Sequence, residues 1–266
     1  MIERKNNPAD ECAQPDAAAC VHEVVLSLLR SEKAGCLHDV PTGEGAFAAH
    51  AKELGCEVSC GDIVPDRFRA PGLTCDRVDL NQRWPYPSDT FDHVTSIEAI
   101  EHLESPWHMI REAARVLRVG GTFFLTTPNI LSIKSRISVL LYGYPNYFTA
   151  MVNHDPETNR ESPVDHINPV SFFELRHILV RSGFSIERVE TNRCLKQRSL
   201  LYQLLRRLLH TRGRSQVLHD KARAHVRELA LSEPLLFGEI LIVQARKLQL
   251  DGLVDLDESH RKEGDM

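Results

Sequence analysis

The chain has 266 residues, of which 42% are hydrophobic and 26% charged, and its formal net charge is −5 at pH 7. This length accommodates one sizeable α/β domain with appendages, and an acidic chain is not a globally basic nucleic-acid binder, so no sequence-specific nucleic-acid partner is expected. No stretch approaches the ~20 apolar residues of a membrane span and the N-terminal segment has no apolar signal core, which predicts a cytoplasmic protein.

The two ends of the chain and its cysteines show no structural pattern. Residues 1–16 are polar, and residues 247–266 are acidic and unpatterned, so we expect flexible tails on either side of a domain over 17–246. The seven cysteines contain no zinc-type CxxC pair and fit no disulfide framework, and we expect them to be reduced and structural.

Helical and strand patterns alternate through the first half of the domain. The short spacing between Asp62 and Thr74 leaves room for little more than a turn at residues 65–69. Ser105 can cap a helix that we expect to end at Gly120. The expected helices are 21–30, 44–55 and 106–119, and the expected strands are 36–40, 56–60, 74–78 and 91–97.

The second half continues this alternation. A strand over 122–127 is expected to stop at Pro128, which cannot donate to a ladder. Ser171 and Glu174 make a capping box for a helix over 172–182. Alternating segments of this kind predict a parallel sheet covered by helices on both faces. The last two strands are expected at 184–190 and 237–245.

The stretch from His38 to Phe47, HDVPTGEGAF, places an acid at the end of the first strand and two glycines before the next helix. Such glycines let the backbone approach a ligand beside the positive helix N-terminus, which suits a nucleotide-like cofactor. The run from Gly43 to Ala48 also matches the dinucleotide pattern GxGxxA, with Asp62 at about the offset of a ribose-binding acid. The pattern is therefore also consistent with NAD binding and with a strand-to-helix turn that binds no ligand.

Two further observations favour S-adenosylmethionine (SAM) over NAD. A carboxylate at Asp39 would repel a pyrophosphate but can balance the ammonium group of SAM, which carries no phosphate. Asp79 follows the third strand, at a point where an adenine amino group can be bound.

With these residues and the segments FDHVTSIEAIEHL, RVLRVGG and TTPN, the chain resembles class I SAM-dependent methyltransferases. The resemblance covers roughly residues 36–190 and the late strand, and looks most like the branch with ubiquinone-type O-methyltransferases and many glycan or natural-product methyltransferases. It implies a Rossmann-like, doubly wound α/β fold whose seven-stranded sheet is mostly parallel with a late antiparallel strand, plus helical insertions.

The resemblance also implies roles for individual residues. Pro41 departs from the family pattern where the first glycine is usual, and Val119 departs where a proline is usual, so the cofactor pose beside Pro41 stays open. We expect a side chain at Gly45 to crowd the cofactor. The residues implied to hold SAM are Asp39, Gly43 and Gly45 at the methionine part, Asp62 at both ribose hydroxyls, Asp79 and Leu80 at adenine, and Ile97 near the methionine.

Glu98, Glu101 and His102 stand at i, i+3 and i+4, which on a helical turn puts three potential ligands on one side. In the related methyltransferases a similar segment can bind a divalent metal near the substrate hydroxyl, which implies Mg²⁺, Mn²⁺ or Zn²⁺ here. The alternative is a structural segment in which His102 is hydrogen-bonded. His102 and His166 are the candidate catalytic bases, and His166 is also a further candidate ligand.

Two insertions are candidates for acceptor binding. Residues 129–168 are rich in Tyr, Phe, Asn and His and are expected to form a lid or acceptor loop, although aromatic residues also anchor ordinary loops. Residues 193–232 are basic, with a leucine stripe over 200–209. Residues 196–214 can either lie peripherally on an anionic membrane, bind a phosphate-bearing acceptor, or pack on the domain.

We therefore predict a SAM-dependent methyltransferase that acts on an oxygen of a small-molecule, glycan or lipid-linked acceptor. An NAD-dependent oxidoreductase of Rossmann type and a non-catalytic SAM-binding or regulatory protein are the alternatives. The sequence does not specify the acceptor or the oligomeric state.

Overall fold

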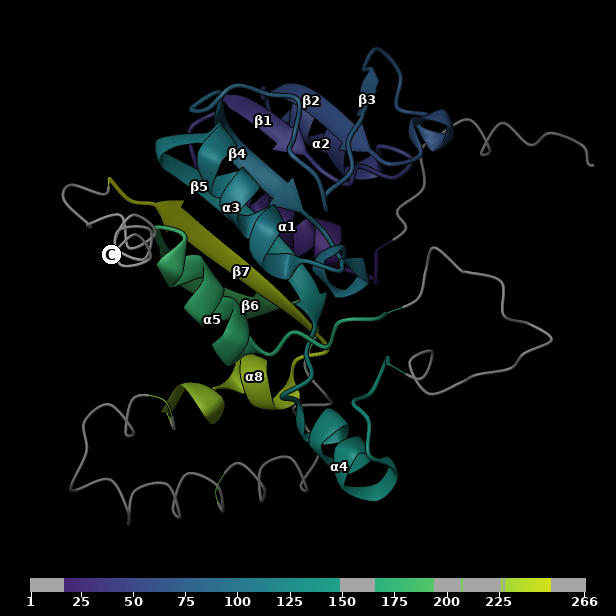
Figure 1. The fold of residues 1–266 in the computed structure, drawn as a ribbon, viewed down its shortest axis with the longest axis vertical. Helices are drawn as coiled ribbons and strands as arrows, with labels where there is room; N and C mark the ends of the chain where they lie inside the picture. Colours follow the sequence, from purple (N-terminus) through teal and green to yellow (C-terminus); the bar gives the residue numbers. More distant parts are fainter. Residues whose placement is uncertain (1–16, 149–165, 194–206, 208–225, 227, 250–266) are drawn as a thin grey trace, which may run out of the picture.

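The computed structural model describes residues 17–148, 166–193, 207, 226 and 228–249 (Figure 1). Five strands of the described part lie before residue 129 and two lie after residue 183. The strands are β1 (Cys36–Asp39), β2 (Glu57–Asp62), β3 (Cys75–Arg77), β4 (Phe91–Ser96), β5 (Leu117–Pro128), β6 (Phe184–Thr191) and β7 (Ile240–Lys247).

The seven strands form one sheet in the order β3-β2-β1-β4-β5-β7-β6. The pairs from β3 to β5 are parallel, whereas β7 is antiparallel to both of its neighbours. This confirms the predicted seven-stranded, mostly parallel sheet with a late antiparallel strand. The strand order reverses direction at β1 and β4, and ligands of open α/β sheets bind outside the carboxyl ends of the strands at such a point.

Helices cover the two faces of the sheet (Figure 1). Phe123 and Phe124 are consecutive residues of β5, yet each belongs to a different apolar core. The core around Phe124 includes α1 and α2, and the core around Phe123 includes α3 and α5, which confirms the doubly wound arrangement. The helices are α1 (Val21–Leu29), α2 (Ala46–Glu53), α3 (Pro106–Val116), α4 (Ile133–Tyr142), α5 (Phe172–Arg181) and α8 (Glu233–Phe237).

The predicted helix starts at Ser105 and Ser171 are confirmed, whereas one predicted helix end is wrong. The hydroxyl oxygens of Ser105 and Ser171 accept hydrogen bonds from backbone N–H groups three residues on, as capping residues do. The expected extension of α3 to Gly120 is wrong, because α3 ends at Val116 and β5 begins at once. Leu117 pairs with Phe91 of β4, and that long-range pairing competes with the last helical turn.

Other differences concern short elements. The segment 65–69 is a 3₁₀ turn over Pro65–Arg67, as predicted. α4 and α8 were not predicted as helices at these positions, and the final strand begins at Ile240 and includes Lys247, which was assigned to the tail. Several predicted segments lie outside the described residues: the tails 1–16 and 250–266, the segment 149–165 and nearly all of 196–214.

Two sequence-based exclusions concern the described part of the chain. Its five cysteines are free thiols. None of the helices described has the length and hydropathy of a membrane span.

Candidate active site

Asp39 ends β1 at the carboxyl edge of the sheet and is 1% exposed. Its two carboxylate oxygens accept hydrogen bonds from the hydroxyls of Thr95 and Thr42, both at 2.7 Å. Burial raises the pKa of Asp39 to about 6, against the two hydroxyl bonds, which lower it. Each oxygen keeps acceptor capacity, so this carboxylate can hold the two threonines and also face a cation.

The loop after β1 is tied to the end of β2. The second carboxylate, Asp62, accepts hydrogen bonds from the backbone N–H of Gly43 and of Val64, both at 2.9 Å. Thr42 N–H also donates to the carbonyl of Gly61 at 2.9 Å. The structure therefore brings Asp39, Gly43 and Asp62 together, as predicted. Asp62 also stabilises the two loops, whether or not it contacts a ligand.

Gly45 is required by the protein itself. Its φ is +92°, and a Cβ added there would collide with the ring of Phe68 and the methyl of Ala70. The expectation that a side chain at Gly45 would crowd the cofactor stays a prediction, and the segment after β2 adds crowding that does not depend on a ligand. The peptide bond between Val40 and Pro41 is cis.

The remaining predicted cofactor residues lie at neighbouring strand ends. Asp79 is half-buried, and its carboxylate accepts a hydrogen bond from Asn81 N–H at 2.9 Å. The side-chain oxygen of Asn81 in turn accepts from the backbone N–H of Glu104 and Ser105, which ties this turn to the start of α3. Leu80 and Ile97 are buried in opposite cores, so their side chains are mainly core residues.

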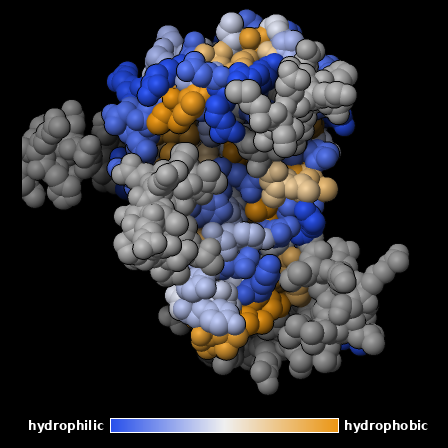
Figure 2. Space-filling model, turned by 90° about the vertical axis from the view of Figure 1, so that its right-hand side faces the viewer, coloured by the Kyte–Doolittle hydropathy of each residue, from blue (hydrophilic) through white to orange (hydrophobic). Residues whose placement is uncertain are grey.

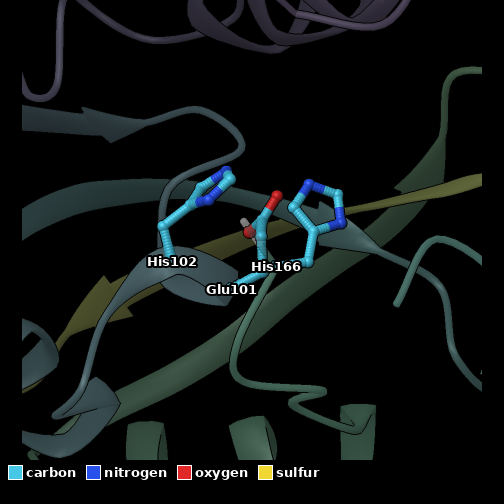
Figure 3. A group of neighbouring side chains, drawn as sticks. All are labelled: Glu101, His102 and His166. Atoms are coloured by element: carbon cyan, nitrogen blue, oxygen red, sulfur yellow. The ribbon is translucent and has the colours of Figure 1, made fainter. Parts of the chain in front are cut away.

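Figure 3 shows Glu101, His102 and His166 with their side chains pointing toward one another. One ligand atom from each lies within 4.8 Å of the other two. Glu101 is fully buried, and the two histidines are half-buried. The imidazole rings of His102 and His166 lie 4.8 Å apart at 70°, and Phe148 packs 5.3 Å from the ring of His166.

Backbone contacts hold the two parts of this group in place. Glu101 and His102 belong to a 3₁₀ turn over Ile100–His102 that follows β4. The carbonyl of Glu101 accepts hydrogen bonds from the N–H of Ile167 and Asn168, both at 2.9 Å. The Asn168 side chain also donates to the carbonyl of Leu103 at 3.2 Å. His166 is thereby fixed beside a turn about 65 residues earlier in the chain.

Glu101 has an unusual electrostatic environment. One carboxylate oxygen accepts a hydrogen bond from the Thr127 hydroxyl at 3.1 Å, and the other has no hydrogen-bond partner among the described residues. Burial raises the pKa of Glu101 to about 8, and the nearby charge of Glu98 adds to this shift. A buried acid with an open oxygen can either stay protonated or share its charge with a cation.

Glu98 does not join this group, and the prediction that Glu98, Glu101 and His102 share one helical face is wrong. Glu98 precedes the 3₁₀ turn with a φ of +46°, outside helical geometry. Its carboxylate accepts a hydrogen bond from the backbone N–H of Ala18, before α1. Burial also raises the pKa of Glu98. His166 takes the third place that the i, i+3, i+4 spacing gave to Glu98.

Sequence reasoning missed several supporting residues. Thr95 and Thr127 sit on β4 and β5 and orient Asp39 and Glu101 respectively. Asn168 holds the turn that carries Glu101. Thr95 and Thr127 belong to the FDHVTSIEAIEHL and TTPN segments that carried the resemblance, whereas Asn168 has no distinctive local pattern.

A cavity of about 620 Å³ lies at the opposite, amino-terminal edge of the sheet. Its charged walls are paired with one another, for example Arg246 with Glu32 at 2.8 Å and Arg118 with Asp92 at 2.7 Å. None of the predicted site residues lines it, so the candidate active site remains at the carboxyl edge.

Comparison with known proteins identifies the family. A family model described as a methyltransferase domain matches residues 14–189. The chain belongs to this methyltransferase domain family. This stretch includes all predicted cofactor residues as well as Glu101, His102 and His166.

Curated relatives that match part of the chain are methyltransferases, and a solved structure shares its fold. The ubiquinone biosynthesis O-methyltransferase of Xanthomonas campestris pv. campestris is 32% identical over 100 residues, 34% of this chain and 42% of the relative. The 27-O-demethylrifamycin SV methyltransferase of Amycolatopsis mediterranei is 51% identical over 41 residues, 15% of each chain. The chain thus spans less than half the length of these relatives. A SAM-dependent methyltransferase of Archaeoglobus fulgidus shares the fold, with a TM-score of 0.55 and 20% identity, over 85% of this chain and 94% of that one.

Proposed function

We propose that this chain transfers the methyl group of SAM to an oxygen of a small-molecule, glycan or lipid-linked acceptor. The observation that carries the proposal is the group of Glu101, His102 and His166 at the same sheet edge as Asp39 and Asp62. The names of the two curated relatives, which both specify O-methylation or an O-demethylated substrate, support oxygen as the accepting atom.

The polar groups at this edge fit SAM better than NAD. Asp39, Asp62 and Asp79 supply carboxylate oxygens, which suit the ammonium, ribose hydroxyls and adenine amino group of SAM and would repel a pyrophosphate. When bound, SAM supplies a methyl group on a sulfonium that is already a good leaving group. We assign Asp62 to the ribose, Asp79 with Leu80 to adenine, and Asp39, Gly43, Gly45 and Ile97 to the methionine part.

The histidines are the groups suited to act on the acceptor. Methyl transfer is an in-line displacement, so the protein has to orient the acceptor oxygen and, for a hydroxyl, remove its proton. The imidazole of His102 or His166 can accept that proton, and their 4.8 Å separation lets one group orient while the other acts as base. His166 and Phe148, which packs on it, both belong to the 129–168 insertion, and this supports a role of that insertion in acceptor binding.

The same three side chains fit a divalent metal. Two imidazoles and one carboxylate suit Zn²⁺ or Mn²⁺ better than Mg²⁺, which prefers oxygen ligands. The open oxygen of Glu101 is consistent with this role, because a cation would offset the cost of ionising a buried acid. A bound metal would lower the pKa of a coordinated acceptor hydroxyl. Glu98 is then not a ligand.

Calorimetry tests the cofactor first. SAM and S-adenosylhomocysteine are expected to bind and NAD is not. Binding of NAD in place of SAM would favour an oxidoreductase. A screen of hydroxylated small molecules, glycans and lipid-linked sugars, read out as S-adenosylhomocysteine formation, then tests turnover. SAM binding without turnover on any acceptor class would favour a non-catalytic SAM-binding protein.

The metal content of the parent and of single variants tests the proposed metal site. After chelation and reloading with Zn²⁺ or Mn²⁺, the parent and Glu98→Gln are expected to retain about one ion per chain, whereas Glu101→Gln and His166→Ala lose it. Chelation is expected to leave SAM affinity unchanged and to suppress turnover. Full turnover of chelated protein would reject the metal and leave His102 or His166 as the base.

A further inference from the structure

α4 exposes an unusually apolar surface. Its last turns carry five large apolar or aromatic side chains that are 45% to 82% exposed. Leu140 is the most exposed of these, at 82%. Scattered single apolar residues are normal on a protein surface, but a contiguous set on one short helix marks an interaction site. The set consists of Ile137, Val139, Leu140, Leu141 and Tyr142, called here the α4 patch.

The inner side of α4 is polar, which inverts the usual arrangement. Ser132 and Ser135 are buried, and Ser138 is half-buried. The hydroxyl oxygen of Ser135 accepts a hydrogen bond from the N–H of Asn146 at 3.0 Å. A surface helix normally turns its apolar stripe to the core and its polar face to water. α4 instead contributes Ile133 to a small apolar cluster around α8 and presents the rest of its apolar side chains outward.

The position of α4 suits a flat apolar medium. α4 projects from the end of the molecule, beyond the sheet and next to α8 (Figure 1). In Figure 2, hydrophobic atoms are exposed at this lower end. A single projecting helix is convex, so a protein partner would need a matching groove, whereas lipid acyl chains adapt to any shape.

The charge and aromatic content of α4 also indicate a lipid surface. α4 carries Lys134 and Arg136 and no acidic residue, in a chain whose net charge is −5. Tyr142 and Tyr144, with rings 6.3 Å apart, lie at its carboxyl end. Helices that lie in the plane of a membrane interface combine cations, aliphatic side chains and aromatic rings in this way. Lys134 lies over the ring of Tyr147 and Arg136 donates to the carbonyls of Leu131 and Ala230, but both side chains are exposed, so their charge can still attract anionic headgroups.

We infer that α4 is an interfacial helix, which docks on the surface of an anionic lipid bilayer through the α4 patch. The segment that follows α4 leads to Tyr147 and to Phe148, which packs on His166. A short segment, residues 143–148, thereby connects the α4 patch to the candidate active site. If the proposed methyl transfer holds, this favours an acceptor with a lipid anchor over a freely soluble one.

Vesicle sedimentation tests this inference without SAM or an acceptor, so its outcome is independent of the methyl transfer. The probes are vesicles of phosphatidylcholine alone and of phosphatidylcholine with phosphatidylglycerol. The full chain is expected to bind the anionic vesicles more tightly, and salt is expected to weaken that preference. The double variant Leu140→Asn, Leu141→Asn is expected to bind at least about tenfold more weakly, because two leucines no longer enter the acyl region.

A matched control uses two apolar residues of similar exposure on other elements, Val119 at 53% and Val180 at 52%. The double variant Val119→Asn, Val180→Asn is expected to bind vesicles as the parent does. Circular dichroism and SAM calorimetry verify that both double variants are folded.

Three results would overturn the inference. The parent chain does not bind vesicles, or the α4 variant binds them like the parent, which would place the contact elsewhere, such as residues 196–214. In the third result, the parent is a dimer without lipid, the α4 variant is a monomer, and neither protein binds vesicles. That result would show that a second copy of the chain covers the α4 patch.

Discussion

The proposed cofactor side of the candidate active site, with Asp39 and Asp62, and the proposed acceptor side, with Glu101 and His166, are built in different ways. On the cofactor side, Asp39 and Asp62 are last residues of adjacent strands, and every carboxylate oxygen has a hydrogen-bond partner at 2.7–2.9 Å. On the acceptor side, the 3₁₀ turn with Glu101 is joined to residues 166–168 by a few backbone hydrogen bonds. The sheet ladder positions the first region, whereas contacts between distant segments position the second.

This difference separates what the two regions can do. Neighbouring strand ends hold the polar groups of the cofactor side in place, so the free-energy cost of reorganising them when a ligand binds is small. The acceptor side leaves one oxygen of Glu101 without a described partner and exposes an apolar helix. The open oxygen of Glu101 and the exposed apolar side chains of α4 indicate that this region binds groups outside the described residues, such as a ligand or a surface.

The largest expected effect is on the acceptor side. His166→Ala should lower turnover by about 10²–10⁴-fold, the range for loss of a general base, while the SAM dissociation constant stays unchanged. Methyl transfer to the acceptor found in the screen and SAM calorimetry measure the two quantities. His177→Ala on the exposed face of α5 is the matched control and should be silent. Normal turnover of His166→Ala would exclude His166 as the base and leave His102, or orientation of the acceptor alone, to carry the reaction.

The next effect concerns the stability of the cofactor side. Gly45 and Gly55 have similar φ angles, +92° and +88°, but a Cβ at Gly55 meets nothing closer than Ala34 at 3.9 Å. Gly55→Ala should therefore cost about 1 kcal/mol of unfolding free energy from strain alone, and Gly45→Ala about 2–4 kcal/mol, since crowding against Phe68 is added. Urea unfolding compares the two variants. Equal costs would show that Phe68 yields easily.

A smaller effect is expected on cofactor affinity. Asp62→Asn should raise the SAM dissociation constant by about 5–100-fold, equivalent to about 1–3 kcal/mol, through weaker bonds to the ribose hydroxyls. Asparagine is preferred to alanine here, because its single side-chain oxygen can still accept from one of the two N–H groups of Gly43 and Val64, whereas alanine leaves both unsatisfied. Asp76→Asn on exposed β3 is the control. A folded Asp62→Asn protein with parental affinity would reject the ribose assignment.

The smallest effect is the pH dependence of stability from Asp39. The pKa of Asp39 in the folded state, about 6, lies above its ordinary value of 3.8, so protonation favours folding. The contribution of Asp39 to stability is greatest below pH 3.8 and falls as the pH rises through 6. Asp39→Asn does not titrate at this position. The free energy of unfolding that it loses relative to the parent should therefore be about 1–3 kcal/mol smaller at neutral pH than near pH 4. Urea unfolding without SAM measures this, and an equal loss at both pH values would contradict it.

Patterns within short stretches of sequence predicted much of this protein. The alternation of strands and helices predicted the sheet, and Ser105 and Ser171 marked helix starts. The acid and glycines of HDVPTGEGAF predicted that Asp39, Gly43 and Asp62 lie at one edge. These features are predictable because hydrophobic period, capping and the shared direction of parallel strands act locally or through the sheet itself.

Tertiary contacts decided the rest. The third member of the Glu101 and His102 group is His166 rather than Glu98, because Glu98 adopts a left-handed φ and bonds Ala18, while backbone bonds bring residues 166–168 to Glu101. The need for glycine at position 45 comes from Phe68, and the end of α3 comes from the pairing of Leu117 with Phe91. Each outcome depends on which distant segment occupies a given space, and spacing along the chain does not contain that information.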